Sequence, residues 1–341
     1  MTRWRPFVSD APARDWTALL SQASDGGPFQ SYAWGEYKRQ FGWEPERWVS
    51  TNGSGASICC LQSLKKRLPL HRVLVWVPGG PVIGFPEARA EQIGDAVSAW
   101  LIQFQQENRL LYVRFYSQQR GLAEMRASLH RVCTRPAFQL NSGYTIEIDL
   151  SKPMDALRSG MTAKHRYYVK HAQAAGIEWE LGHSEELIRE TALLHDEMCR
   201  IKHLERRLRM DPAHLRALQH AFGESCRVMV GRHGGTPVAG CIVLLLADRA
   251  FFWRSAVGER GRKLSATYAM VAELFERLKA MGITRFDFGG VALSDPSVAG
   301  VNHFKRGFGG EIVEYLGEWE WAASSMLRRG ANDLMRRMTR W

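Results

Sequence analysis

The sequence predicts an α+β (or α/β) fold in which two domains each carry a mixed β-sheet flanked by helices. With 341 residues, the chain is long enough for two domains that each bury a core. Helical periodicity over 87–108 and over 264–281 leads in each case into a short strand, at 110–116 and at 284–288. The second half therefore repeats the order of elements of the first half.

Composition places the chain among globular proteins, with 45% apolar and 24% charged residues. The longest apolar run, Val238 to Ala247, is too short to cross a bilayer, and residues 1–16 show no signal peptide. Six cysteines lack any metal-ligand spacing, which is typical of reduced thiols. We therefore expect a cytoplasmic protein without a metal site.

The net charge of +11 is concentrated in three segments, 158–174, 200–216 and 326–341. Clustered cations indicate a partner rich in phosphate. A solvated basic surface is an equally good interpretation of the charge alone.

In the first domain, Ser31 caps a helix with an apolar face, and Gly42 ends it. Lys38 lies on this helix, where a lysine is ordinarily a surface residue. Strands are expected at 47–50, 56–64 and 73–77, before the long helix. We place the first domain at 1–150.

The second domain, 151–319, follows an alternating strand at 144–151. Its first helix carries a basic flank formed by Lys164, Arg166 and Lys170, which a solvated helix surface also explains. Helices are then expected over 185–203 and 212–222, with an arginine-rich connection that contains Arg207 and Arg209. Three strands follow as a meander, at 226–231, 238–246 and 250–256. Histidines on these helices show no metal-ligand or catalytic pairing.

The segment 282–318 closes the second domain. The strand 284–288 ends at a pair of glycines, and the sequence FKRGFGG follows, with Lys305 and Arg306 between two phenylalanines. Glycines beside a fixed lysine suit a site that stabilises negative charge. A glycine-rich β-turn with a solvated lysine is the plainer interpretation.

Several of these stretches resemble the Fem family of aminoacyltransferases. The resemblance is carried by FDFGGV at 286–291, FKRGFGG at 304–310 and EYLGE at 314–318, and upstream by the helix with Lys38 and the "DLS" crossover at 149–151. It implies two GNAT-like domains and transfer of an amino acid from aminoacyl-tRNA to an amine of a peptidoglycan precursor. No segment is long enough for the helical-hairpin arm of some members. The strand 110–116 also lacks the acidic residue that many members carry at its end.

The resemblance assigns roles to particular residues. Lys305 is expected to stabilise the oxyanion as the catalytic residue, and no cofactor is implied beyond aminoacyl-tRNA as co-substrate. The residues expected to bind substrate are Lys38, Arg209, Arg207, Phe304, Trp253 and Tyr268. The residues expected to bind tRNA are Lys164, Arg166, Lys170 and Arg306.

Other interpretations remain open. The segment 259–266 resembles the pyrophosphate loop of GNAT enzymes that use acyl-CoA, although it lacks their two glycines. An enzyme acting on a small peptide, or a non-catalytic RNA-binding protein, fits the charge as well. A terminal helix within 320–341 is expected to pack its apolar side on the first domain. The functional alternative, which can hold at the same time, is that its arginines face outward and meet tRNA phosphates or the anionic inner membrane leaflet.

Overall fold

The computed structural model describes residues 3–203, 210–293 and 295–340. The chain separates into two compact units. Unit 1 combines residues 1–144 with 314–341, and unit 2 comprises residues 145–313.

The strands of unit 1 form one sheet in which all neighbours are antiparallel except β4 and β5. Helix α3 (Ile93–Glu107) makes the crossover between these two parallel strands. In order across the sheet, the strands are β1 (Arg3–Pro6), β2 (Glu44–Thr51), β3 (Ser57–Arg67), β4 (Arg72–Gly79), β5 (Arg109–Arg120) and β12 (Glu311–Ala322).

The strands of unit 2 follow the same plan. The parallel pair here is β10 and β11, joined by helix α10 (Ala266–Ala280), and the other neighbours are antiparallel. In order, the strands are β7 (Glu178–Gly182), β8 (Cys226–His233), β9 (Thr236–Leu246), β10 (Arg249–Val257), β11 (Arg285–Asp287) and β6 (Tyr144–Asp149). Each unit is thus a meander, a helical crossover to a parallel strand, and an antiparallel strand beside it.

The helices of unit 1 lie against its sheet. Trp100 and Phe104 of α3, for example, are fully buried and pack in one core with Trp319 of β12. Ser31 caps α2 through a hydrogen bond from the amide of Trp34 to its hydroxyl, as the sequence predicted. Besides α3, the helices of unit 1 are α1 (Pro12–Ser21), α2 (Tyr32–Arg39), α4 (Ala123–His130) and α12 (Ser325–Arg340).

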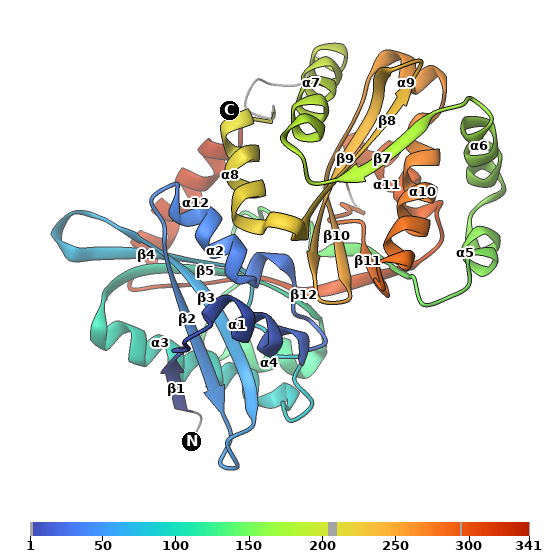
Figure 1. Cartoon of the computed structure of the whole chain (residues 1–341). Helices are drawn as coiled ribbons and strands as arrows, with labels where there is room; N and C mark the ends of the chain where they lie inside the picture. The colour runs from blue at the N-terminus through green and yellow to red at the C-terminus, as the bar shows by residue number, and fades with distance from the viewer. Residues whose placement is uncertain (1–2, 204–209, 294, 341) are drawn as a thin grey trace. The chain divides into compact units, whose positions relative to one another are not determined.

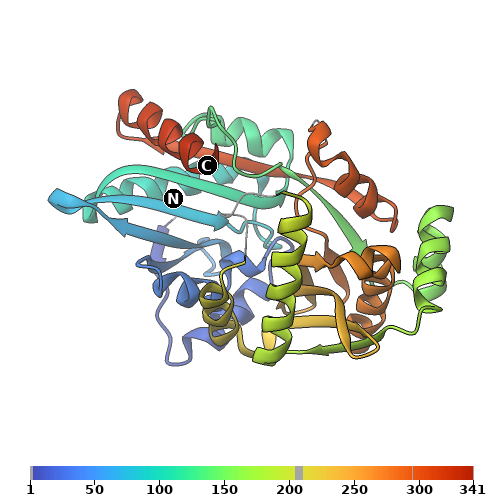
Figure 2. The ribbon, with the colours of Figure 1, turned by 90° about the horizontal axis from the view of Figure 1, so that it is seen from above.

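In unit 2, helix α7 lies on one side of the β8–β10 meander, and α10 lies on the other side with α6 packed against it (Figures 1 and 2). Side chains of Thr162, Ser184 and Asp211 cap α6, α7 and α8. The helices are α5 (Met154–Gly160), α6 (Ala163–Gln173), α7 (Glu185–Ile201), α8 (Pro212–Phe222), α9 (Glu259–Lys263), α10 and α11 (Ala299–Arg306). No helix among the described residues is long and apolar enough to span a membrane.

Helix α12 lies along β5 in unit 1 and differs from its prediction (Figure 2). It starts at Ser325, because residues 320–322 belong to β12. Its inward side is also partly polar, since Asn332 donates to the buried carboxylate of Glu320 at 2.8 Å. The apolar Met326 and Leu334 are instead 79% and 56% exposed. The prediction that the apolar side packs inward was therefore wrong for these two residues.

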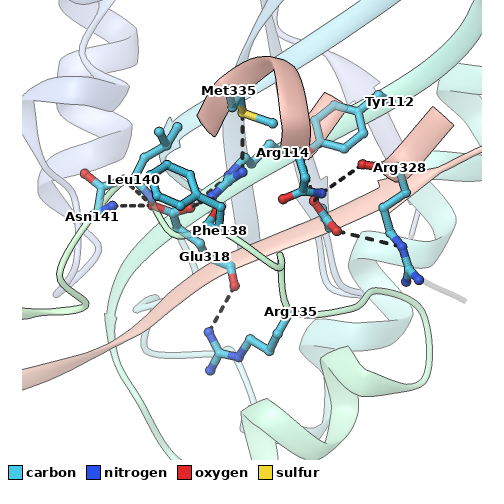
Figure 3. Close-up of polar contacts among 11 residues, drawn as sticks. Tyr112, Arg114, Arg135, Phe138, Leu140, Asn141, Glu318, Arg328 and Met335 are labelled. Atoms are coloured by element: carbon cyan, nitrogen blue, oxygen red, sulfur yellow. Dashed lines mark hydrogen bonds and ion pairs between the residues drawn. The ribbon is translucent and has the colours of Figure 1, made fainter. Parts of the chain in front are cut away.

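A buried polar network explains this orientation (Figure 3). Arg114 of β5 and Glu318 of β12 form an ion pair in which both side chains are almost fully buried. The other Glu318 oxygen accepts the amides of Leu140 at 2.8 Å and Asn141 at 2.5 Å, and Arg114 also donates to Met335 of α12. Because buried charges need partners, the Asn332 amide and the Met335 sulfur of α12 face this side of the sheet, as a donor to Glu320 and an acceptor from Arg114.

Candidate active site

The candidate site lies where the parallel strands β10 and β11 stop pairing. Their register covers only Arg249–Phe251 and Arg285–Asp287. The chain then turns at Gly289, whose φ of +70° favours glycine and whose Cβ, if present, would lie 3.3 Å from the Phe252 carbonyl oxygen. Ligands of α/β sheets commonly bind at the carboxyl ends of parallel strands. The expected Gly289–Gly290 turn therefore marks the correct edge of the sheet for a site.

Lys305 points to this turn from the last turn of α11. Its Nζ donates to the carbonyl oxygen of Gly290 at 2.8 Å and to that of Gly289 at 3.3 Å. Burial lowers its pKa to about 8, although the nearby Asp287 carboxylate opposes this shift. The interpretation as a β-turn with a solvated lysine was wrong, because residues 299–306 form a helix and the ammonium group is held by two carbonyls.

The side chains of Asp287 and Thr145 fix the conformation of the Gly289 turn through hydrogen bonds. Asp287 accepts the Gly289 amide at 2.6 Å, and the Thr145 hydroxyl contacts both the Asp287 carboxylate and the Gly289 carbonyl oxygen. The carbonyls that bind Lys305 are thus fixed by side chains of β11 and of the neighbouring strand β6. Neither residue was predicted to be functional from the sequence, although Asp287 directly precedes the Phe-Gly-Gly end of its strand.

His165 of α6 connects this helix to α11. Its side chain is fully buried, and burial lowers its pKa. Nε2 lies 2.9 Å from the Phe304 carbonyl oxygen, which only accepts, so Nε2 carries the proton and Nδ1 accepts from the Thr162 hydroxyl at 2.8 Å. His165 was missed in the sequence. The signal was its spacing with Val169 and Ala172 on the buried stripe of the helix.

Aromatic side chains surround this connection. The rings of Phe304 and Tyr268 lie 5.2 Å apart, and Tyr268 stacks on Tyr168 of α6 at 4.8 Å. Trp253 lies at a β-bulge of β10, where the register with β9 shifts between Phe252 and Arg254. Bulges of this kind re-aim side chains and are frequent next to active sites. Phe304 and Tyr268 are therefore brought together near Lys305, and Trp253 lies on the adjacent strand.

Lys38 lies in unit 1 and is not an ordinary surface lysine. Its Nζ lies over the rings of Trp34, Tyr37 and Trp76, at 4.9, 4.8 and 5.6 Å from their centroids. Burial lowers its pKa to about 8. Aromatic faces stabilise an ammonium group that is partly removed from water.

The predicted tRNA-binding residues are exposed. Lys164 and Lys170 project from α6, and Arg306 lies at the end of α11. Arg166 is also exposed, but its guanidinium donates to carbonyl oxygens at the end of α5. Arg207 and Arg209 lie outside the described residues. Within the part of the chain that the structure describes, no three His, Cys, Asp or Glu side chains are placed to hold a metal ion.

Comparison with known proteins agrees with the fold described above. Residues 160–306 match the family described as the acetyltransferase (GNAT) domain. A crystal structure of FemX superposes with a TM-score of 0.83 at 14% sequence identity, covering 97% of this chain and 100% of FemX. The chain has a Fem-like GNAT fold. The fold class predicted from the sequence, and the GNAT-like fold that the Fem resemblance implied, are thus confirmed.

Two further structures share the Fem-like fold less closely. One is the C-terminal domain of a putative lysylphosphatidylglycerol synthetase from Agrobacterium fabrum, with a TM-score of 0.54 and 15% identity, covering 93% of this chain and 94% of that domain. The other is a tandem GNAT protein from the clavulanic acid biosynthesis pathway, with a TM-score of 0.55 and 13% identity, covering 95% of this chain and 99% of that protein. Comparison with curated proteins gave no significant match.

Proposed function

We propose that this protein transfers the aminoacyl group of aminoacyl-tRNA to an amine of a peptidoglycan precursor or a related peptide. The acceptor nitrogen attacks the ester carbonyl, and a peptide bond forms as the bond to the ribose oxygen breaks. The proton lost by the amine balances the proton taken up by the released tRNA hydroxyl. This reaction needs no cofactor, and its transition state places negative charge on the carbonyl oxygen.

The placement of Lys305 is the observation that carries the proposal. Two of its three N–H donors are directed to the carbonyls of Gly289 and Gly290, which leaves one donor for a substrate oxygen. A cation that is already oriented loses little freedom when the oxyanion forms, which is the basis of electrostatic catalysis. Lys305 would thus stabilise the tetrahedral oxyanion.

Lys38 supports a phosphate-bearing acceptor. An ammonium group held against three aromatic rings is positioned for an anion such as a diphosphate, and contact with the anion would compensate its partial desolvation. An acceptor that is a small peptide without phosphate would leave Lys38 without this role. The acceptor is therefore proposed to be nucleotide-linked or lipid-linked.

Acyl-CoA is the competing donor, because the matching family is described by acetyl transfer. In such enzymes, phosphate binds to backbone amides before the crossover helix. Here the amide of Glu259 donates to the carboxylate of Glu197 at 2.9 Å, and that of Gly258 donates to the Val238 carbonyl. Pyrophosphate at this position would meet a carboxylate, which favours aminoacyl-tRNA as the donor.

The test incubates purified protein with either charged tRNA or acetyl-CoA as the donor. Each donor is combined with amine acceptors that carry a diphosphate and with amine acceptors that lack one. We expect a peptide-bonded product only with charged tRNA, and faster transfer to the diphosphate acceptors. Product formation with acetyl-CoA alone would replace the proposal by its competitor.

A further inference from the structure

We propose that a track of aromatic rings leading from the surface of α6 to Phe304 binds the unpaired 3′ end of the RNA donor by base stacking. The inference rests on the proposed use of aminoacyl-tRNA. The aromatic track is defined as Tyr167, Tyr168, Tyr268 and Phe304.

Tyr167 is the outer end of the aromatic track. Its side chain is 65% exposed, and no other Phe, Trp or Tyr side chain in the described ranges is exposed. The inward side of α6 is formed by His165, Val169 and Ala172, so Tyr167 stands on the opposite side of the helix. An exposed ring contributes nothing to a core, but it offers a flat apolar face to a ligand.

The rings of the aromatic track follow one another at contact distance. Tyr167 lies 5.4 Å from Tyr168, which stacks on Tyr268 with an interplanar angle of 29°. Tyr268 in turn meets Phe304, the residue before Lys305, edge to face at 5.2 Å. All four side chains belong to unit 2. A strand whose bases follow these rings would bring its terminal ester to the candidate oxyanion site.

Cations border the outer end of the aromatic track. Residues 158–174 contain no acidic residue, and Lys164 and Lys170 are exposed, with no ion pair among the described residues. The Lys164 Nζ lies 6.0 Å from the Tyr168 ring centroid, and the His171 ring lies nearly parallel to that of Tyr167. Proteins that bind single-stranded nucleic acid combine such rings for the bases with cations for the backbone.

The chemistry favours an unpaired RNA end over other anionic partners. A duplex presents phosphates but hides the faces of its bases, so it has no use for an exposed ring. An anionic lipid surface would be recognised by the lysines alone. Only a partner with free base faces uses both the rings and the cations, and aminoacyl-tRNA carries its ester on such an end.

The test measures binding of two uncharged RNA hairpins, one with a four-nucleotide 3′ overhang and one with a blunt end. A 2-aminopurine in the overhang reports stacking through quenching of its fluorescence. The variants are Tyr167→Ala, Tyr167→Phe and the control Leu193→Ala, which alters an exposed residue of α7. Thermal unfolding of each variant checks the fold.

We expect wild type, Tyr167→Phe and Leu193→Ala to prefer the overhang hairpin and to quench its fluorescence. Tyr167→Ala should lose roughly fivefold or more in affinity for the overhang, since one stacked base contributes on the order of 1–3 kcal/mol. Its affinity for the blunt hairpin should be unchanged. Equal binding of the overhang by wild type and Tyr167→Ala would overturn the inference.

Two controls separate this inference from the proposed function. Because the hairpins are uncharged, the binding test does not depend on aminoacyl transfer. Overhang binding by a protein that forms no transfer product would refute only the proposed function. Product formation by a protein that shows no preference for the overhang would refute only the aromatic track. The second control is sedimentation of the protein with phosphatidylglycerol vesicles. If the protein sediments through Lys164 and Lys170 and shows no preference for the overhang hairpin, this surface binds lipid and the inference is overturned.

Discussion

His165 Nε2 donates to the carbonyl oxygen of Phe304 at 2.9 Å, and this bond joins helix α6 to the helix that carries Lys305. The amide of Thr162 donates to the Gly307 carbonyl at 2.9 Å, which joins the same two helices a second time. Since α11 has only eight residues, its position depends on such contacts. The placement of Lys305 is therefore determined partly by α6, a helix far from it in sequence.

The first prediction concerns Lys305 itself. Lys305→Met should lower kcat by about 10²–10³, as is typical for loss of one oxyanion donor, and leave the acceptor KM nearly unchanged. The matched control is Lys263→Met, which removes a lysine that is exposed and paired with Glu259. Steady-state kinetics with charged tRNA measures both, and an unaltered kcat in Lys305→Met would remove Lys305 from the mechanism.

The second prediction is a pH dependence. Because the pKa of Lys305 is lowered from 10.5 to about 8, its charged form prevails below pH 8, and kcat should fall as the pH rises through 8. Between pH 8 and 10.5 the folded protein binds fewer protons at this residue than the unfolded chain. The residue's contribution to the free energy of unfolding therefore rises with pH in this window. Lys305→Met should lack this contribution, and a rise equal to that of wild type would contradict the assignment.

A third prediction tests the contact between α6 and α11. A Cβ at Gly307 would overlap the His165 ring, so Gly307→Ala should lower kcat and cost about 1–3 kcal/mol of stability by overpacking. His165→Ala in the same chain removes the obstructing ring. The double variant should therefore lose less stability than the sum of the losses in the two single variants, as measured by urea unfolding. Additive effects would show that the two residues do not interact.

The fourth prediction concerns Lys38. Lys38→Ala should raise the KM for a diphosphate-bearing acceptor far more than it lowers kcat, because uniform binding is lost. For an acceptor without phosphate, KM should not change. Arg39→Ala serves as the control, since Arg39 is more exposed and pairs with Glu36 on the same helix. A wild-type KM for the diphosphate acceptor in Lys38→Ala would reject the phosphate contact.

The fifth prediction concerns the buried ion pair in unit 1. Glu318→Gln leaves the Arg114 guanidinium buried without a carboxylate, which should cost about 3–5 kcal/mol of stability. Arg158→Gln is the control, because its pair with Glu276 is half exposed and should contribute only about 0–1 kcal/mol. Urea unfolding of both variants measures the difference, and equal losses would show that burial does not set the strength of the pair.

The sequence predicted most of the architecture, because a long amphipathic helix with clear periodicity joins the two strands of each parallel pair. It did not predict α11, since Ala299–Arg306 contains two small residues and no capping side chain, and its helix is held by contacts from α6. The partners of Lys305 were equally hidden, because they are backbone carbonyls. The burial of Glu318 and Glu320 was not predicted, although their spacing by two residues places them on one face of a strand.

The two sheets differ in how their sixth strand is supplied, and this has a consequence during synthesis. Unit 2 is one continuous segment, 145–313, whereas unit 1 obtains β12 from the other end of the chain. On the ribosome, β5 emerges some two hundred residues before the strand that pairs with its free edge. This edge of β5 therefore has no partner strand until residues up to 322 have been translated. Unpaired edges promote association between chains.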